Sequence, residues 1–81
     1  MIVNVRVNGV IAQKMGVARL SLALPGSATM QDLREMLQLK HPELSSELGR
    51  AVTVVGGTHQ PATAVLVDGQ EVALLLPIAG G

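Results

Sequence analysis

The stretch Glu71–Pro77, EVALLLP, is an almost uninterrupted apolar run that follows a tight-turn signal, Asp68-Gly69, and stops at a proline. A strand with one solvated face alternates apolar and polar residues, whereas a strand covered on both faces has a nearly continuous apolar run. Asp-Gly is typical of tight turns beside strands. The stretch therefore predicts a buried strand in the interior of a sheet, with other elements on both sides of it.

The opening stretch, MIVNVRV, has the period of a strand with one covered face, because Val3, Val5 and Val7 fall on the same side. Residues 18–25, ARLSLALP, alternate in the same way. Residues 10–16, VIAQKMG, lie between them and predict a helical turn that a glycine ends. We expect the two alternating stretches to pair as antiparallel strands.

Residues 29–40 carry the clearest helix signal. Thr29 is a favourable N-cap, and Asp32 adds negative charge to the first turn, although Glu or Gln usually completes a capping box. His41-Pro42 predicts the helix end, because the residue before a proline avoids helical backbone. The predicted apolar stripe consists of Met30, Leu33, Met36, Leu37 and the stem of Lys40.

Residues 42–49, PELSSELG, predict a second, short helix that Gly49 closes. Residues 51–55, AVTVV, predict a strand followed by a Gly-Gly turn, whereas residues 58–67 have no regular period. The order of elements predicts an α+β fold, a mixed sheet packed against one main helix. The first and last strands, which are the most apolar, are expected at its centre.

The composition excludes several classes of protein. Six basic and six acidic residues balance and are scattered, so no nucleic-acid or membrane-surface footprint is predicted. The chain has no aromatic residue to stack on bases and no cysteine for a disulfide, a thiolate or Cys-ligated zinc. We recognise no targeting segment and no run of the roughly 18 apolar residues that span a membrane. We expect a cytoplasmic protein that binds neither nucleic acid nor membrane.

Few side chains suggest catalysis. The only histidines, His41 and His59, have no matching carboxylate pair and are interpreted as surface residues. The acidic residues of the predicted helices are interpreted as solvated, and Gly56-Gly57 lacks the Lys-Ser/Thr of a phosphate loop. We therefore predict no metal site, no cofactor bound by the chain and no catalytic side chains of its own.

The candidate functional segment is Pro77–Gly81, PIAGG. Pro77 prevents further strand pairing, and the five residues reach about 16 Å when extended, enough to enter a tunnel in a partner. Glycine has no Cβ, so a narrow tunnel could admit Gly80 and Gly81 and a nucleotide could approach the terminal carboxylate. We divide the chain into a folded domain, residues 1–76, and a flexible C-terminal Gly-Gly tail, residues 77–81.

Residues 67–81, VDGQEVALLLPIAGG, resemble the C-terminal signature of the MoaD/ThiS family of ubiquitin-like sulfur carriers, which have the β-grasp fold. The opening strand, ATMQDLREML at residues 28–37 and VTVVGG at residues 52–57 extend the resemblance over most of the chain. The likeness is greatest to the MoaD branch, the small subunits of molybdopterin synthases. This chain departs from the family in having leucines where aromatics are common, followed by a single proline.

The resemblance implies how the C-terminal Gly81 would be activated and used to carry sulfur. An E1-like adenylating enzyme of the MoeB/ThiF type would use ATP and Mg²⁺ to adenylate the Gly81 carboxylate, and a sulfur donor would convert the product to a thiocarboxylate. The MoaE-type large subunit of molybdopterin synthase would then receive the tail, and with it sulfur for the molybdenum or tungsten cofactor. The chain would be a carrier and not an enzyme. Gly80 and Gly81 would carry the chemistry, and we hypothesise that the partner contacts fall on Leu74, Leu75, Leu76, Pro77, Ile78 and Ala79.

Other functions would use the same residues. The activated Gly81 could pass to a lysine amine, which would make the chain a ubiquitin-like protein modifier, or the chain could carry sulfur for thiamine or another pathway. In a plain binding module the two glycines would be only a flexible end. Conjugation predicts high-mass adducts in cells, whereas a binding module predicts that deletion of Gly80-Gly81 leaves function intact.

Overall fold

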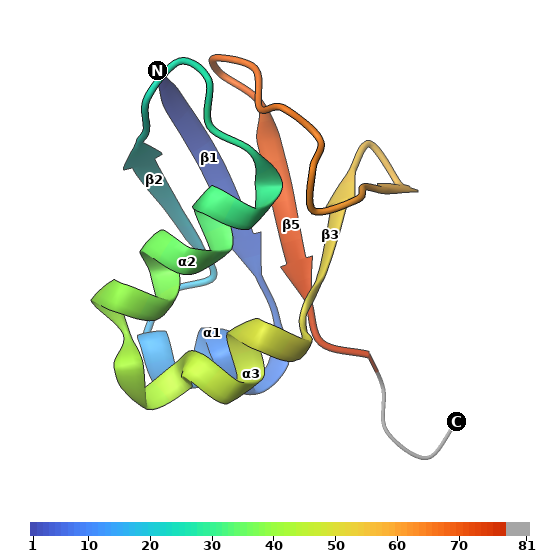
Figure 1. Ribbon diagram of the computed structural model, residues 1–81. Coiled ribbons are helices and arrows are strands. Elements are labelled where there is room, and N and C mark those ends of the chain that lie inside the picture. Colours follow the sequence, from blue (N-terminus) through green and yellow to red (C-terminus); the bar gives the residue numbers. More distant parts are fainter. Residues whose placement is uncertain (78–81) are drawn as a thin grey trace.

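The computed structural model describes residues 1–77 (Figure 1). Five strands form one sheet in the order β2-β1-β5-β3-β4, so the first and last strands are central, as predicted. The elements in chain order are β1 (Ile2–Val7), α1 (Gly9–Met15), β2 (Arg19–Ala23), α2 (Met30–Lys40), the 3₁₀-helix η1 (Pro42–Leu44), α3 (Ser45–Arg50), β3 (Val52–Val55), β4 (Thr58–His59) and β5 (Glu71–Leu75).

The centre of the sheet is the parallel pair of β1 and β5. Val5 lies opposite Val72, and Val7 lies opposite Leu74. On the outer sides, β2 pairs antiparallel with β1, and β3 pairs antiparallel with β5. Val72, Ala73 and Leu74 are all buried although they alternate between the two faces, as the apolar run predicts. Burial on both faces does not extend to the ends of the strand, where Glu71 is exposed and Leu75 is half-buried.

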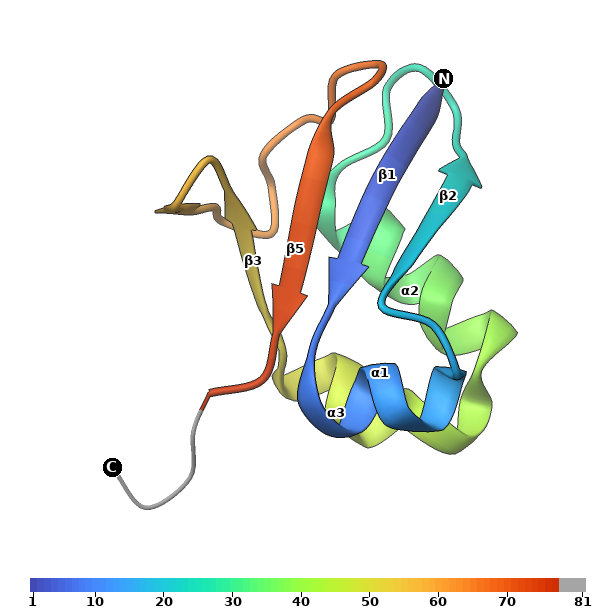
Figure 2. The ribbon, with the colours of Figure 1, turned by 180° about the vertical axis from the view of Figure 1, so that it is seen from behind.

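The helices cover one face of this sheet. Helix α2 crosses that face, and α1 and α3 lie at the end where β1 and β5 finish (Figures 1 and 2). No helix within residues 1–77 covers the opposite face, which is turned toward the viewer in Figure 2. A mixed sheet around one main helix is the α+β, β-grasp arrangement that the resemblance implied.

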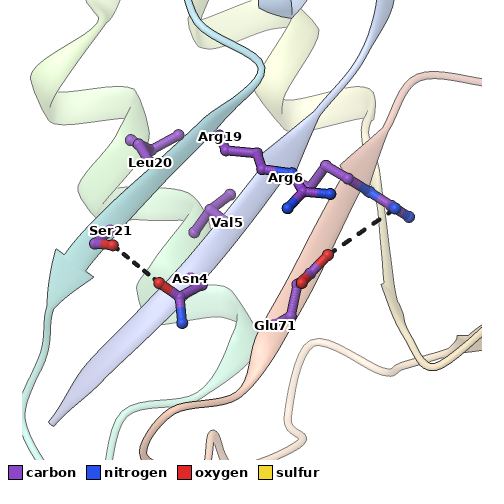
Figure 3. A pocket seen from close by; sticks show the side chains of 7 residues that line it. All are labelled: Asn4, Val5, Arg6, Arg19, Leu20, Ser21 and Glu71. Atoms are coloured by element: carbon purple, nitrogen blue, oxygen red, sulfur yellow. Dashed lines mark hydrogen bonds and ion pairs between the residues drawn. The ribbon is translucent and has the colours of Figure 1, made fainter.

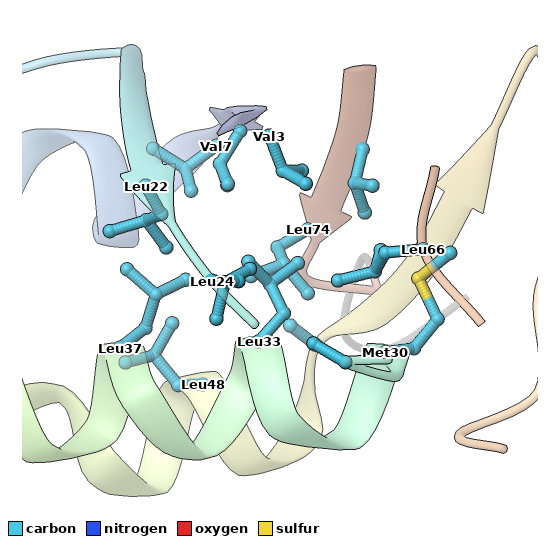
Figure 4. Close-up of a cluster of buried hydrophobic side chains, with 14 of the residues drawn as sticks. Val3, Val7, Leu22, Leu24, Met30, Leu33, Leu37, Leu48, Leu66 and Leu74 are labelled. Atoms are coloured by element: carbon cyan, nitrogen blue, oxygen red, sulfur yellow. The ribbon is translucent and has the colours of Figure 1, made fainter. Parts of the chain in front are cut away.

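The core between the sheet and α2 is aliphatic (Figure 4). Leu33 and Leu37 of α2 are fully buried in the same cluster as the odd-numbered valines of β1. Burial of one such side chain contributes about 1.5–3 kcal/mol. The predicted stripe is confirmed through Leu37, with Met36 half-buried, but Lys40 is exposed and does not extend it.

Helix α2 begins with a complete capping box. The Thr29 hydroxyl accepts a hydrogen bond from the Asp32 N–H at 3.2 Å, and the Asp32 carboxylate accepts one from the Thr29 N–H at 2.9 Å. The shorter aspartate side chain therefore accepts the hydrogen bond that Glu or Gln usually accepts in a capping box. Two backbone N–H donors at the helix start are thus satisfied.

Helix α3 ends differently from the sequence prediction. It runs through Gly49 to Arg50, and Gly49 does not adopt a left-handed conformation. The reason lies in α2, where the Arg34 guanidinium donates hydrogen bonds to the carbonyls of Leu48 and Ala51. A side chain from another helix satisfies these terminal carbonyls, so no glycine cap is needed.

The predicted helical turn is α1, which Gly16 ends in the left-handed region at φ 79°. The Lys14 ammonium lies 3.0 Å from a Glu47 carboxylate oxygen and ties α1 to α3. The hydrogen bond from Lys14 holds the pKa of the Glu47 carboxyl below its ordinary value. The segment that precedes β5 is irregular, as expected, and an isolated bridge joins Val65 to Thr29.

The capping box supports a stability prediction. Thr29→Ala removes the hydroxyl that accepts the Asp32 N–H, and we expect the free energy of unfolding to fall by about 1 kcal/mol. Urea denaturation followed by circular dichroism measures this. Ser27→Ala, at an exposed position two residues before the cap, is the matched control. Equal destabilisation by both substitutions would show that the capping box does not stabilise α2.

Candidate functional site

Strand β5 carries the chain to the end of the sheet at which its neighbours turn away. Its last register partners are Val7 of β1, opposite Leu74, and Val52 of β3, opposite Leu75. Beyond Val7, β1 gives way to α1, which begins at Gly9. The backbone of β5 therefore loses its parallel neighbour where the tail begins.

The side chain of Asn8 takes the place of that missing neighbour. Its Oδ1 atom accepts a hydrogen bond from the Leu76 N–H at 3.2 Å. The Leu76 side chain is half-buried and packs against the core, whereas Pro77 is exposed and has no N–H to donate. The chain is thus anchored at Leu76 and leaves the sheet at Pro77. No local sequence signal places Asn8 beside the tail, because the contact joins residues that are 68 positions apart.

The chain leaves the sheet over residues 74–77, called the exit below. The three leucines of the exit differ in exposure. Leu74 is fully buried in the core, and Leu76 is half-buried beside it. Leu75 is half-buried on the face that lacks a helix, opposite Val52 of β3. Because Leu74 presents no surface, it stabilises the core and is not available to a partner. Of the predicted partner contacts, Leu75, Leu76 and Pro77 remain accessible.

The other predicted site residues, Ile78, Ala79, Gly80 and Gly81, lie outside the described residues. The division into a domain of residues 1–76 and a tail of residues 77–81 therefore stays a prediction.

The remaining polar side chains do not assemble a second centre. His41 Nδ1 lies 3.5 Å from a Glu43 carboxylate oxygen, and His59 is exposed in β4. Within residues 1–77, no three His, Asp or Glu side chains gather in a way that could hold a metal ion. The helices of this part of the chain are too short or too polar to cross a membrane. Gly56 and Gly57 form the predicted turn, with φ values of 55° and 80°.

The central strand β5 leads into the segment of residues 77–81, PIAGG. The model of the ThiS family matches residues 3–81, which include this segment. The chain therefore belongs to the ThiS family, and its resemblance to the MoaD/ThiS sulfur carriers is confirmed. No curated protein sequence matches the chain.

Several solved structures from archaea and bacteria superpose on this fold. SAMP1 of Haloferax volcanii, a small archaeal modifier protein, superposes with a TM-score of 0.86 at 21% identity over all of both chains. The ubiquitin of Caldiarchaeum subterraneum matches with a TM-score of 0.69 at 16% identity, covering 100% of this chain and 98% of the other. A chain of the complex of subunits 1 and 2 of molybdopterin-converting factor from Helicobacter pylori matches with a TM-score of 0.71 at 27% identity over all of both chains.

The anchor at the exit supports a prediction about local opening. Asn8→Ala removes the acceptor for the Leu76 N–H, and loss of about 1 kcal/mol would raise the hydrogen-exchange rate of that amide about fivefold. Amide exchange followed by nuclear magnetic resonance measures it. Asn8→Asp keeps an oxygen acceptor at the same position and should preserve the protection. An unchanged Leu76 rate in Asn8→Ala would mean that the anchor does not hold the exit.

Proposed function

We propose that this protein is a sulfur carrier that acts as the small subunit of a molybdopterin synthase. In this function the carboxylate of Gly81 is adenylated, converted to a thiocarboxylate and presented to a large subunit that holds the pterin precursor. The chain binds no cofactor itself, and ATP and Mg²⁺ are bound by an E1-like activating enzyme. The protein is thus the substrate of one partner and the sulfur-donating subunit of the other.

The observation that carries this proposal is the family match, which extends from residue 3 through Gly80 and Gly81. The molybdopterin branch is supported by the Helicobacter pylori complex, because its 27% identity extends over the whole of both chains. The geometry of the exit adds a physical reason. The central strand β5 is anchored at Leu76 and leads to an exposed Pro77, where a partner can reach the chain.

The proposed chemistry balances without any oxidant or reductant when sulfide is the donor. A Gly81 carboxylate oxygen attacks the α-phosphorus of ATP, and pyrophosphate leaves with the electrons of the broken P–O bond. Hydrosulfide then attacks the acyl carbon and expels AMP, leaving the thiocarboxylate and one proton. The carrier needs no side-chain catalyst for either step, because the activating enzyme binds the nucleotide and stabilises both transition states.

This chemistry predicts a specific mass change. We expect incubation with ATP, Mg²⁺, an E1-like activating enzyme and sulfide to give a chain that reacts with a thiol-selective alkylating agent at Gly81. The protein has no cysteine, so no other group competes for the reagent. Intact-mass and fragment mass spectrometry locate the adduct. Alkylation is essential, because oxidation of any of the four methionines gives nearly the mass change of replacing oxygen by sulfur.

Two controls make this experiment decisive. A chain without Gly81 should form no adduct, and omission of ATP should abolish the adduct of the full chain. An adduct that persists without Gly81 would place the reactive group elsewhere. Absence of any adduct with several competent activating enzymes would contradict the sulfur-carrier function. Transfer of sulfur from the isolated thiocarboxylate to a pterin precursor, in the presence of the large subunit, tests the molybdopterin branch.

The half-buried Leu75 gives a second prediction. Leu75→Glu places a charge on the helix-free face beside the tail, and we expect partner affinity to fall at least tenfold because an apolar contact becomes a buried charge. Thermal unfolding should change little. Leu74→Glu is the contrasting variant, which should unfold the domain because Leu74 is fully buried. Unfolding of Leu75→Glu would show that Leu75 is a core residue and not a contact.

A ubiquitin-like modifier is the second candidate, favoured by the fold shared with SAMP1. Activation of Gly81 is common to both functions, but the acceptor differs. A modifier transfers its acyl group to a lysine amine and releases AMP, which leaves a stable isopeptide bond. Affinity purification of the tagged chain from cells would then recover high-mass adducts that an isopeptidase removes. Recovery of the thiocarboxylate without such adducts would favour the carrier.

A further inference from the structure

The helix-free face of the sheet, called the open face below, has an ordered pattern of side chains. Even-numbered residues of β1 and odd-numbered residues of β2 and β5 point to it, because their neighbours in sequence lie in the core. The pattern is basic toward β2 and apolar toward β3. One row crosses all five strands, each member opposite the next: Arg19, Arg6, Ala73, Val54 and His59.

The two arginines of this row meet where side chains of neighbouring strands come closest. Met1 and Leu24 exchange both backbone hydrogen bonds, at 2.8 and 2.9 Å. Such pairs alternate along an antiparallel ladder with pairs that exchange none, in which the side chains lie nearer to each other. By this alternation, Arg6 and Arg19 form a pair of the second kind. Like charges directly opposite each other destabilise a sheet.

Only one of the two arginines pairs with a carboxylate. Glu71 on β5 lies 3.9 Å from Arg6, with both side chains about half exposed (Figure 3). Within residues 1–77, Arg19 makes no hydrogen bond or ion pair. The two guanidinium groups and Glu71 therefore leave a net positive charge at a shallow pocket, lined by Asn4, Val5, Arg6, Arg19, Leu20, Ser21 and Glu71.

The apolar part of the open face adjoins the tail exit. Ala73 is only 4% exposed although it points to this face, in a depression also lined by Arg6 and Val54. Val52 lies opposite Leu75, one residue before the anchored Leu76, and both side chains are half-buried. A protein that grips the chain after Pro77 therefore meets an apolar surface first and the arginine pair beyond it.

We propose that the open face docks the large subunit of the synthase, and that this partner presents a carboxylate side chain to Arg19 and Arg6. This inference rests on the proposed function. The planar guanidinium fork matches a carboxylate with two parallel hydrogen bonds, and a second carboxylate would balance the charge that Glu71 leaves uncompensated. The adjoining apolar residues and the zero net charge of the chain fit a protein surface, not a nucleic acid.

Charge reversal at Arg19 separates docking from folding. Arg19→Glu turns the like-charge pair with Arg6 into an opposite-charge pair, so the unfolding temperature should stay the same or rise. Affinity for the cognate large subunit should nevertheless fall at least tenfold, and the remaining binding should depend less on salt concentration. Titration calorimetry at low and high salt measures both effects. Arg19→Lys, which keeps the charge but loses the fork, should show an intermediate loss.

Arg50→Glu is the matched control, because it reverses an exposed arginine on α3, away from the open face. It should leave binding unchanged. Equal affinity of wild type and Arg19→Glu, or an equal loss in Arg50→Glu, overturns the docking assignment while the proposed function stands. If Arg19→Glu impaired only adenylation by the activating enzyme, the docking assignment would also be overturned, because the open face would then bind the activating enzyme and not the large subunit. Failure of the wild-type chain both to form a thiocarboxylate and to bind the large subunit overturns the proposed function.

Discussion

The parallel pairing of β1 with β5 is the contact on which the rest of the structure depends. It joins the beginning of the chain to its end, and hydrogen bonds fix the join at the start of both strands. The Gly69 N–H donates to the Ile2 carbonyl at 2.7 Å, and the Ile2 N–H donates to the Asp68 carboxylate at 2.8 Å. Such a long-range pair closes a large loop, so it must be stabilised by burial on both strands. Because the strands are parallel, they finish at the same end, which brings Asn8 to the backbone of Leu76.

The same pairing separates the tasks of the two faces. Alternation puts Val3, Val5 and Val7 of β1 under α2, and it puts Asn4 and Arg6 on the open face. A shift of the register by one residue would exchange these sets and bury charge, so the register is strongly specified. The buried contacts that stabilise the domain therefore lie on the face under α2 and near Leu76. The open face contributes less to stability, so it can hold residues that do not favour folding, such as the opposed arginines.

The sequence predicted the parts of the fold that depend on local period and local signals. The alternation of the first strand, the stripe and cap of α2, and the unbroken run of β5 are each readable within one segment. The missed features all require knowledge of neighbours from elsewhere in the chain. Arg34 replaces the cap expected from Gly49, and Asn8 holds an exit that follows it by 68 residues. The burial of Leu74 rather than Leu75 likewise depends on which face α2 covers.

For the proposed carrier, placing residues 77–81 in a partner has an entropic cost that contacts of the folded domain can offset. Ordering five residues in a partner's tunnel costs about 5–10 kcal/mol in backbone entropy, and glycines lie at the high end. Burial of about 200–400 Å² of apolar surface is needed to offset that cost. The two glycines and one alanine of PIAGG have little side-chain surface to bury. The anchored exit limits the number of residues to be ordered, and Leu75 with its neighbours on the open face can supply the missing apolar contact. The folded domain would then supply most of the affinity for the partner. The sequence of the tail would be constrained mainly by the reaction at the Gly81 carboxylate.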